Sequence, residues 1–120
     1  MHKLNKAIGN YGEDIGEEYL IKNNYTIKER NFRCRTGEID IIAYNEEYMC
    51  FVEVKTRYDC SFGTPAEAVN KTKQYKLKKL AEFYVYKNNY YNYNIRFDIV
   101  EIILNGLDNK YQIKLIKNAF

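Results

Sequence analysis

Three residues in the first half of the chain have the types and spacing of a hydrolytic metal site. Asp40 is followed about a dozen residues later by Glu53, and Lys55 lies two residues beyond Glu53. Two carboxylates together can hold a hard divalent cation, which acidifies a bound water. A lysine beside them could deprotonate or orient that water, or offset charge in the transition state. The three residues therefore predict metal-assisted hydrolysis, although acids in surface salt bridges would have the same residue types.

These residues are predicted to lie on a β-hairpin. Residues 39–44 and 49–56 are rich in Ile, Val, Phe and Tyr, which are typical of strands, and a short polar segment separates them. If Glu46–Glu47 forms a two-residue turn, Asp40 lies directly opposite Glu53. The turn therefore fixes which residues face one another.

The same register puts four polar side chains on one face of the hairpin, because side chains alternate along a strand. Glu38 is predicted opposite Lys55, so a salt bridge between them is the alternative role for this lysine. Two carboxylates about 5 Å apart repel by about 3 kcal/mol at an effective dielectric of about 20. A divalent cation between Asp40 and Glu53 would turn that repulsion into ligation, and the Val54 carbonyl could add a ligand.

The chain resembles the YraN family of small bacterial proteins, which are predicted nucleases. Asp40, Glu53 and Lys55 match the D, E and K of the PD-(D/E)XK nuclease signature, with Ile39 in place of its proline. The resemblance extends from about residue 9 to 103. It is carried by four segments, GEID-IIA, FVEVKTR, FGTPAEAV and RFDIV.

The resemblance implies a restriction-endonuclease-like fold, Mg²⁺ or Mn²⁺ as the cofactor and DNA as the substrate. Related nucleases place a first-helix glutamate beside the metal, which assigns that role to Glu13, either binding a second ion or accepting a hydrogen bond from a metal-bound water. A solvated helix acid is the alternative. Resolvase-like relatives present a polar residue from their second helix, which points to Gln74, although a surface glutamine is as common.

Basic residues around the acidic site are candidates for phosphate contacts, because DNA must approach the carboxylates. Any one of them could equally belong to a solvated charged face. The net charge of +3 is mild and permits a nucleic-acid partner without requiring one. The candidates are Arg33, Arg35, Arg57, Lys71, Lys73 and Lys78.

The first helix is expected over residues 5–23, with Asn5 as its N-cap. Gly12 and Gly16 fall near one of its faces, together with Gly9. Each glycine costs a helix about 1 kcal/mol relative to alanine. We therefore expect this face to approach the sheet, or a bound backbone, closely.

A second helix is expected to begin at Thr64–Glu67 (TPAE), where a threonine N-cap, a proline and a reciprocal glutamate form a strong start signal. It is expected to end before residue 88. Its lysines are predicted to point largely outward. Its inward residues are predicted to be Val69, Tyr75, Leu77, Leu80, Ala81, Tyr84 and Val85.

The remaining segments complete a mixed sheet. An edge strand is expected over residues 25–34, a buried strand over 95–104 and a final edge strand over 111–116, while Asp98 is expected to pair with a basic neighbour. The second helix can serve as a crossover that makes the buried strand parallel to the strand carrying Glu53. The order αβββαββ predicts an α/β fold, in agreement with the resemblance.

The length of 120 residues indicates one domain spanning residues 1–120. Three cysteines without a C-x-x-C spacing indicate reduced thiols in a cytoplasmic protein. Neither an export signal nor a run long enough to span a membrane is expected.

Three functions fit these observations. The first is a metal-dependent endonuclease acting on DNA, including branched or single-stranded forms, with a homodimer expected if two strands are cut symmetrically. The second is a nucleic-acid-binding module of the same fold with little or no turnover. The third is a protein-interaction scaffold in which the acids are structural. Metal-dependent cleavage, salt-sensitive binding and Mn²⁺ calorimetry separate them.

Overall fold

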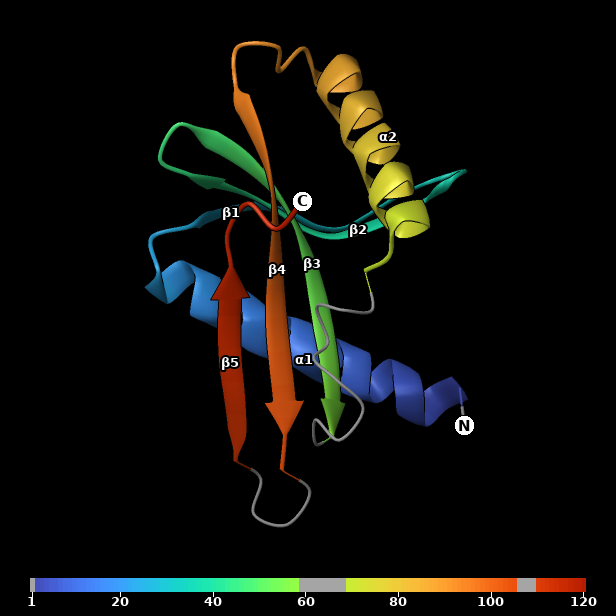
Figure 1. Cartoon of the computed structure of the whole chain (residues 1–120), viewed down its shortest axis with the longest axis vertical. Helices are drawn as coiled ribbons and strands as arrows, with labels where there is room; N and C mark the ends of the chain where they lie inside the picture. Colours follow the sequence, from blue (N-terminus) through green and yellow to red (C-terminus); the bar gives the residue numbers. More distant parts are fainter. Residues whose placement is uncertain (1, 59–68, 106–109) are drawn as a thin grey trace.

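The described residues, 2–58, 69–105 and 110–120, form a mixed β-sheet with a helix on each face in the computed structural model (Figure 1). Side chains are described from residue 10 onward. The strand order is β1-β2-β3-β4-β5, with β3 and β4 parallel and the other pairs antiparallel. The elements are α1 (His2–Lys22), β1 (Thr26–Cys34), β2 (Gly37–Asn45), β3 (Tyr48–Tyr58), α2 (Lys71–Asn88), β4 (Asn94–Leu104) and β5 (Tyr111–Ile116).

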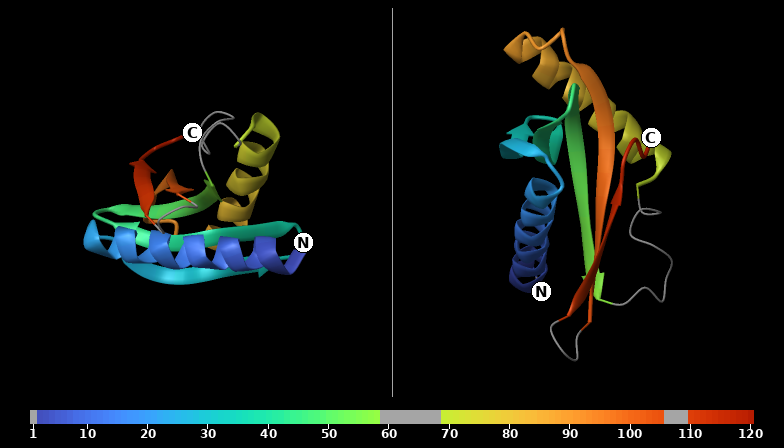
Figure 2. Two further views of the ribbon diagram at one scale, coloured as in Figure 1. Left: turned by 90° about the horizontal axis from the view of Figure 1, so that it is seen from below. Right: turned by 90° about the vertical axis from the view of Figure 1, so that its left-hand side faces the viewer.

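The element order αβββαββ confirms the predicted α/β class and is consistent with a restriction-endonuclease-like fold. The α2 helix is the crossover that brings β4 parallel to β3, as expected. The two helices cover opposite faces of the sheet (Figure 2, right). Within the described chain, neither helix has an apolar stretch long enough to cross a bilayer.

The predicted register of the β2–β3 hairpin is confirmed near its turn. Asn45 pairs with Tyr48, and Ile42 pairs with Phe51. Glu46 has a φ of 58°, in the left-handed region that tight hairpin turns require. The turn therefore puts even-numbered residues of β2 and odd-numbered residues of β3 on one face.

The ladder between β2 and β3 stops earlier than expected. Its last pair joins Ile41 to Val52, so the predicted pairings of Asp40 with Glu53 and of Glu38 with Lys55 are wrong. Beyond this point β2 stays paired with β1 while β3 stays paired with β4, and β2 crosses behind β3 (Figure 1). The two strands therefore separate beyond Ile41 and Val52, where the acidic residues lie.

The α1 helix lies very close to β3, as its glycines predict. A Cβ added at Gly12 would overlap the Thr56 hydroxyl, and one at Gly16 would lie 3.4 Å from Val54. Only glycine permits the approach at position 12, whereas the contact at Gly16 has an ordinary van der Waals length. The helix already begins at His2, so Asn5 lies within it and is not its N-cap.

The α2 helix begins later than predicted. Its first residue is Lys71, and Asn70 is the N-cap, with its side-chain oxygen accepting a hydrogen bond from the Lys73 N–H at 2.9 Å. Val69 therefore precedes the helix, because the extended conformation of Asn70 starts a new cap. The Thr64–Glu67 signal lies outside the described residues.

Most of the predicted inward face of α2 is confirmed, but Tyr75 is 64% exposed. Tyr75 lies two residues from Leu77, about 200° around the helix, so the two side chains cannot face the same way. Lys79 covers the tyrosine ring, with Nζ 5.5 Å from the centroid. The buried residues of α2 are Leu77, Leu80, Ala81, Tyr84 and Val85.

A buried polar network joins β4 to the residue before β1, to the end of β2 and to the C-terminal residues. Asp98 is fully buried and accepts hydrogen bonds from Arg96 Nε (2.9 Å) and the Tyr25 hydroxyl (2.7 Å). It also accepts one from the backbone N–H of Asn118 at 2.9 Å. Arg96 donates further to Asn45 Oδ1 at 2.8 Å. The expected pairing of Asp98 with a basic neighbour is confirmed. These hydrogen bonds and the charge of Arg96 offset the cost of burying the Asp98 carboxylate.

Candidate active site

The acids gather in the opening that the separation of β2 and β3 creates. A cavity of about 250 Å³ lies there, lined by carboxylates from three elements. Glu13 comes from α1, Glu38 and Asp40 from β2, and Glu53 from β3. Asp40 is held in place by the backbone N–H of Val54, which donates to its Oδ2 at 2.8 Å. This side chain thus replaces the next rung of the strand ladder.

Three of these acids are close enough to share one cation. Glu13, Glu38 and Asp40 each offer an oxygen, and the three oxygens lie within 4.8 Å of one another. Hard carboxylate oxygens are the ligands that Mg²⁺ prefers, so the residues fit such an ion. Glu38 was missed as a candidate ligand, although its position two residues before Asp40 already put it on the same face.

Glu53 is engaged differently. It is buried, and its Oε1 contacts Lys73 Nζ at 2.9 Å and Lys55 Nζ at 3.3 Å. Lys55 therefore pairs with Glu53, whereas Glu38 pairs with Arg33 Nε at 2.8 Å. Lys73 was predicted to contact phosphate, and α2 brings it directly against the acid of β3.

Contacts of α1 and β1 hold Glu13 in position. The close contact at Gly12 holds α1 against β3, and Arg30 of β1 lies 3.8 Å from the Glu13 carboxylate. The same guanidinium pairs with Asp14 at 2.6 Å and with Glu17 at 3.3 Å. Of these acids, only Glu13 reaches the cavity.

Burial changes the acidity of the carboxylates. Desolvation, strengthened by the negative charge of Glu53, raises the pKa of Asp40 to about 7, while the Val54 N–H opposes the shift. Desolvation also raises the pKa of Glu13, and Arg30 opposes it. Such carboxylates hold protons unusually well, and a divalent cation among them would favour their charged forms.

The two lysines differ in acidity. Burial, together with the neighbouring ammonium of Lys73, lowers the pKa of Lys55. Burial also acts to lower the pKa of Lys73, but its contacts with Lys55 and Glu53 outweigh that effect and raise it. Lys55 therefore reaches the neutral form that can accept a proton more readily than Lys73, which keeps its positive charge.

The other predicted site residues lie away from the acid cavity. Gln74 donates from its side chain to the Val69 carbonyl at 3.0 Å, which stabilises the start of α2. Lys78 Nζ lies 6.0 Å from the centre of the Phe120 ring. Arg57 is half-buried, and its Nε and Nη2 have no hydrogen-bond partner among the described residues. Arg35 and Lys71 are exposed.

The metal-free protein is expected to lose stability as the pH rises. The pKa of Asp40 is about 7 in the folded chain and about 3.9 when unfolded, so the folded state binds the proton more tightly between these values. The free energy of unfolding should therefore fall between pH 4 and 7 by at most about 4 kcal/mol. Urea denaturation in EDTA at several pH values measures it.

The control for this experiment is Asp40→Asn, which cannot titrate and keeps the side chain's shape. The difference between the wild-type protein and this variant isolates Asp40 from every other titrating group. A difference that does not change with pH would contradict the raised pKa.

Comparisons with known proteins relate nearly the whole chain to one group. The model of a family described as "Uncharacterised protein family UPF0102" matches residues 12–102. A UPF0102 protein of Clostridium acetobutylicum is 51% identical over 120 residues, covering all of this chain and 98% of the relative. Similar proteins of Clostridium novyi (50%, all of both chains) and Clostridium tetani (49%, 98% of the relative) carry the same description. These descriptions assign no activity.

Proposed function

The chain belongs to the uncharacterised protein family UPF0102, the YraN family, and from this premise we propose that it is a metal-dependent endonuclease that hydrolyses DNA. The observation that carries the proposal is the convergence of Glu13, Glu38 and Asp40 at the point where β2 and β3 separate. Carboxylates brought this close repel unless a cation compensates them. Lys55 and Lys73, which contact Glu53 in the same cavity, add the charge that a phosphodiester substrate requires.

The proposed ion is Mg²⁺ or Mn²⁺, held by Glu13, Glu38 and Asp40. When bound, it supplies polarisation of the scissile phosphate and a more acidic water. Glu53 and the Val54 carbonyl remain proposed ligands; for Glu53 this requires its contact with Lys73 to loosen. The Val54 N–H keeps Asp40 oriented throughout.

The lysines have separate proposed roles. Lys55, whose pKa is lowered, accepts the proton of the attacking water. Lys73 keeps its charge and stabilises the negative charge that builds up on the phosphate in the transition state. Gln74 is a positioning residue in this scheme, because it braces the start of the helix that carries Lys73.

One observation favours a second candidate, a nucleic-acid-binding module with little turnover. Glu53 is already neutralised by two ammonium groups, so it gains less from a cation than an unpaired carboxylate would. In that case the lysines bind phosphate but no ion completes the site. We place either activity in the cytoplasm, and a homodimer remains a prediction for symmetric cutting of branched DNA.

The proposal predicts cleavage that depends on a divalent ion. The purified chain is incubated with duplex, flap, single-stranded and four-way DNA in Mg²⁺, Mn²⁺ or EDTA. We expect products from at least one substrate with Mg²⁺ or Mn²⁺ and none in EDTA, because the acids alone cannot polarise the phosphate. Binding that weakens steeply with salt but gives no products would select the binding module. No products, no binding and no heat on titration with Mn²⁺ would refute both.

A further inference from the structure

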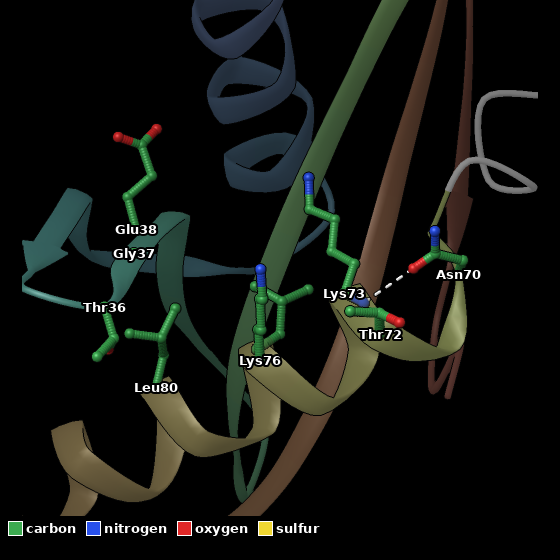
Figure 3. A pocket seen from close by; sticks show the side chains of 9 residues that line it. Thr36, Gly37, Glu38, Asn70, Thr72, Lys73, Lys76 and Leu80 are labelled. Carbon is green, nitrogen blue, oxygen red and sulfur yellow. Dashed lines mark hydrogen bonds between the residues drawn. The ribbon is translucent and has the colours of Figure 1, made fainter.

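A second cavity lies beside the acid cavity, between the start of α2 and the turn joining β1 to β2. We call it the α2 groove; its volume is about 480 Å³ (Figure 3). One wall is formed by Thr36, Gly37 and Glu38, and the other by Thr72, Lys73 and Lys76 of α2. We propose that the α2 groove holds the sugar–phosphate backbone of one DNA strand and leads it to the acid cavity. This inference rests on the proposed function.

The groove and the acid cavity share their boundary residues. Glu38 lines both, and it is also one of the three acids within reach of a common cation. Lys73 lines the groove, while its Nζ lies 2.9 Å from Glu53 in the acid cavity. A strand lying in the groove therefore passes directly to the carboxylates.

The charge of the α2 wall suits a phosphate backbone. Lys73 and Lys76 project to the same side of the helix (Figure 3). Lys76 is exposed and forms no ion pair with any described residue, so its charge is available to a ligand. The first turn of α2 contains no acidic residue that would oppose an anion. Lysines placed in this way neutralise phosphates without reading sequence.

The remaining lining favours sugar and phosphate over bases. Thr36 and Thr72 carry hydroxyl groups that hydrogen-bond to phosphate oxygens, and Leu77 and Leu80 form an apolar floor. Among the described residues that line the groove there is no aromatic ring on which a base could stack. Contacts in the groove are therefore expected to be independent of base sequence.

The size of the groove limits its occupant to one strand. A cavity of about 480 Å³ falls in the range of pockets that enclose small ligands, so it accommodates a short piece of one strand and excludes a whole duplex. The strand can come from unpaired DNA or from one side of a duplex lying over the groove. Both sources present the same sugar–phosphate chemistry.

A matched pair of lysine substitutions tests the inference. Lys76→Gln removes a charge from the groove wall, while Lys22→Gln removes the same charge from α1, on the opposite face of the sheet, where Lys22 pairs with Glu18 at 3.3 Å. Both lysines are exposed and glutamine has a similar helix propensity, so both variants should fold. Binding of labelled oligothymidine and of its duplex with oligoadenine is measured by anisotropy in EDTA over a range of salt concentrations.

We expect Lys76→Gln to weaken binding about threefold to tenfold and to lower the salt slope by about 0.7 for the single strand, or about 0.9 for the duplex. Lys22→Gln should change binding less than about twofold. A loss confined to oligothymidine identifies an unpaired strand as the occupant, and an equal loss on both identifies a strand of duplex DNA.

Equal effects of the two substitutions, or an unchanged slope in Lys76→Gln, would overturn the groove assignment even if the wild-type protein cleaves DNA. A groove effect without metal-dependent cleavage would uphold the groove and refute the nuclease. A wild-type protein that binds neither DNA would refute the groove assignment, and one that also gives no products with Mg²⁺ or Mn²⁺ would refute the nuclease.

Discussion

Replacing Asp40 with asparagine is expected to reduce metal-dependent DNA cleavage by about 1,000-fold, equivalent to about 4 kcal/mol of transition-state stabilisation. Asparagine keeps the oxygen that accepts the Val54 N–H, so the local geometry should survive. It removes the charge that a divalent cation needs. Initial rates of product formation in Mg²⁺ measure the loss, and Mn²⁺ calorimetry should show weaker binding in the same variant.

The matched control is Glu18→Gln, an exposed acid of α1 whose only role in the described chain is a surface pair with Lys22 at 3.3 Å. Its cleavage rate should equal that of the wild-type protein. Asp40→Asn should also be at least as stable as the wild-type protein at neutral pH, because it removes a carboxylate whose burial in charged form destabilises the folded protein. Cleavage that persists at the wild-type rate in Asp40→Asn would place the chemistry elsewhere.

The largest loss of stability is expected from Asp98→Asn. The substitution leaves Arg96 charged and buried without its ionic partner, which typically costs about 3–5 kcal/mol. It also weakens the bonds to Tyr25 and to the backbone of Asn118. Because small domains are stable by only about 5–15 kcal/mol, the variant should unfold at a much lower urea concentration.

Tyr25→Phe provides a milder companion to Asp98→Asn, because it deletes only one hydroxyl of the network and should cost about 1 kcal/mol. It keeps the network testable if Asp98→Asn fails to fold. The affinity for Mn²⁺ should be unchanged in Tyr25→Phe, since the hydroxyl contacts Asp98 and Arg96 and not the acid cavity. Losses below about 0.5 kcal/mol in both variants would show that the network contributes little.

The sequence predicts the hairpin well because local rules determine it. Alternating apolar residues on both sides of Glu46–Glu47 fix the register, and Ile42 lies opposite Phe51 as expected. The parallel placement of β4 follows from the crossover rule. The start of α2 was predicted wrongly because two capping signals occur in succession, and only tertiary structure shows that Asn70 forms a cap.

The parts of the site that could not be predicted depend on long-range structure. No local pattern marks the end of the β2–β3 ladder after Ile41, which is what lets Glu38 approach Glu13. Lys73 reaches Glu53 only because the crossover lays the start of α2 beside β3. The number of residues between Glu53 and Lys73 in the sequence does not predict this contact.

The acidic and the basic residues of the two cavities come from different parts of the sequence. Every carboxylate of the acid cavity lies within the first 53 residues, whereas the lysines of the groove wall come from α2. Under the proposed function, substitutions within residues 71–88 that keep Lys73 and Gln74 could therefore change the contacts with nucleic acid without replacing any of the carboxylates of the acid cavity. Transplanting α2 between relatives offers the protein engineer the same freedom.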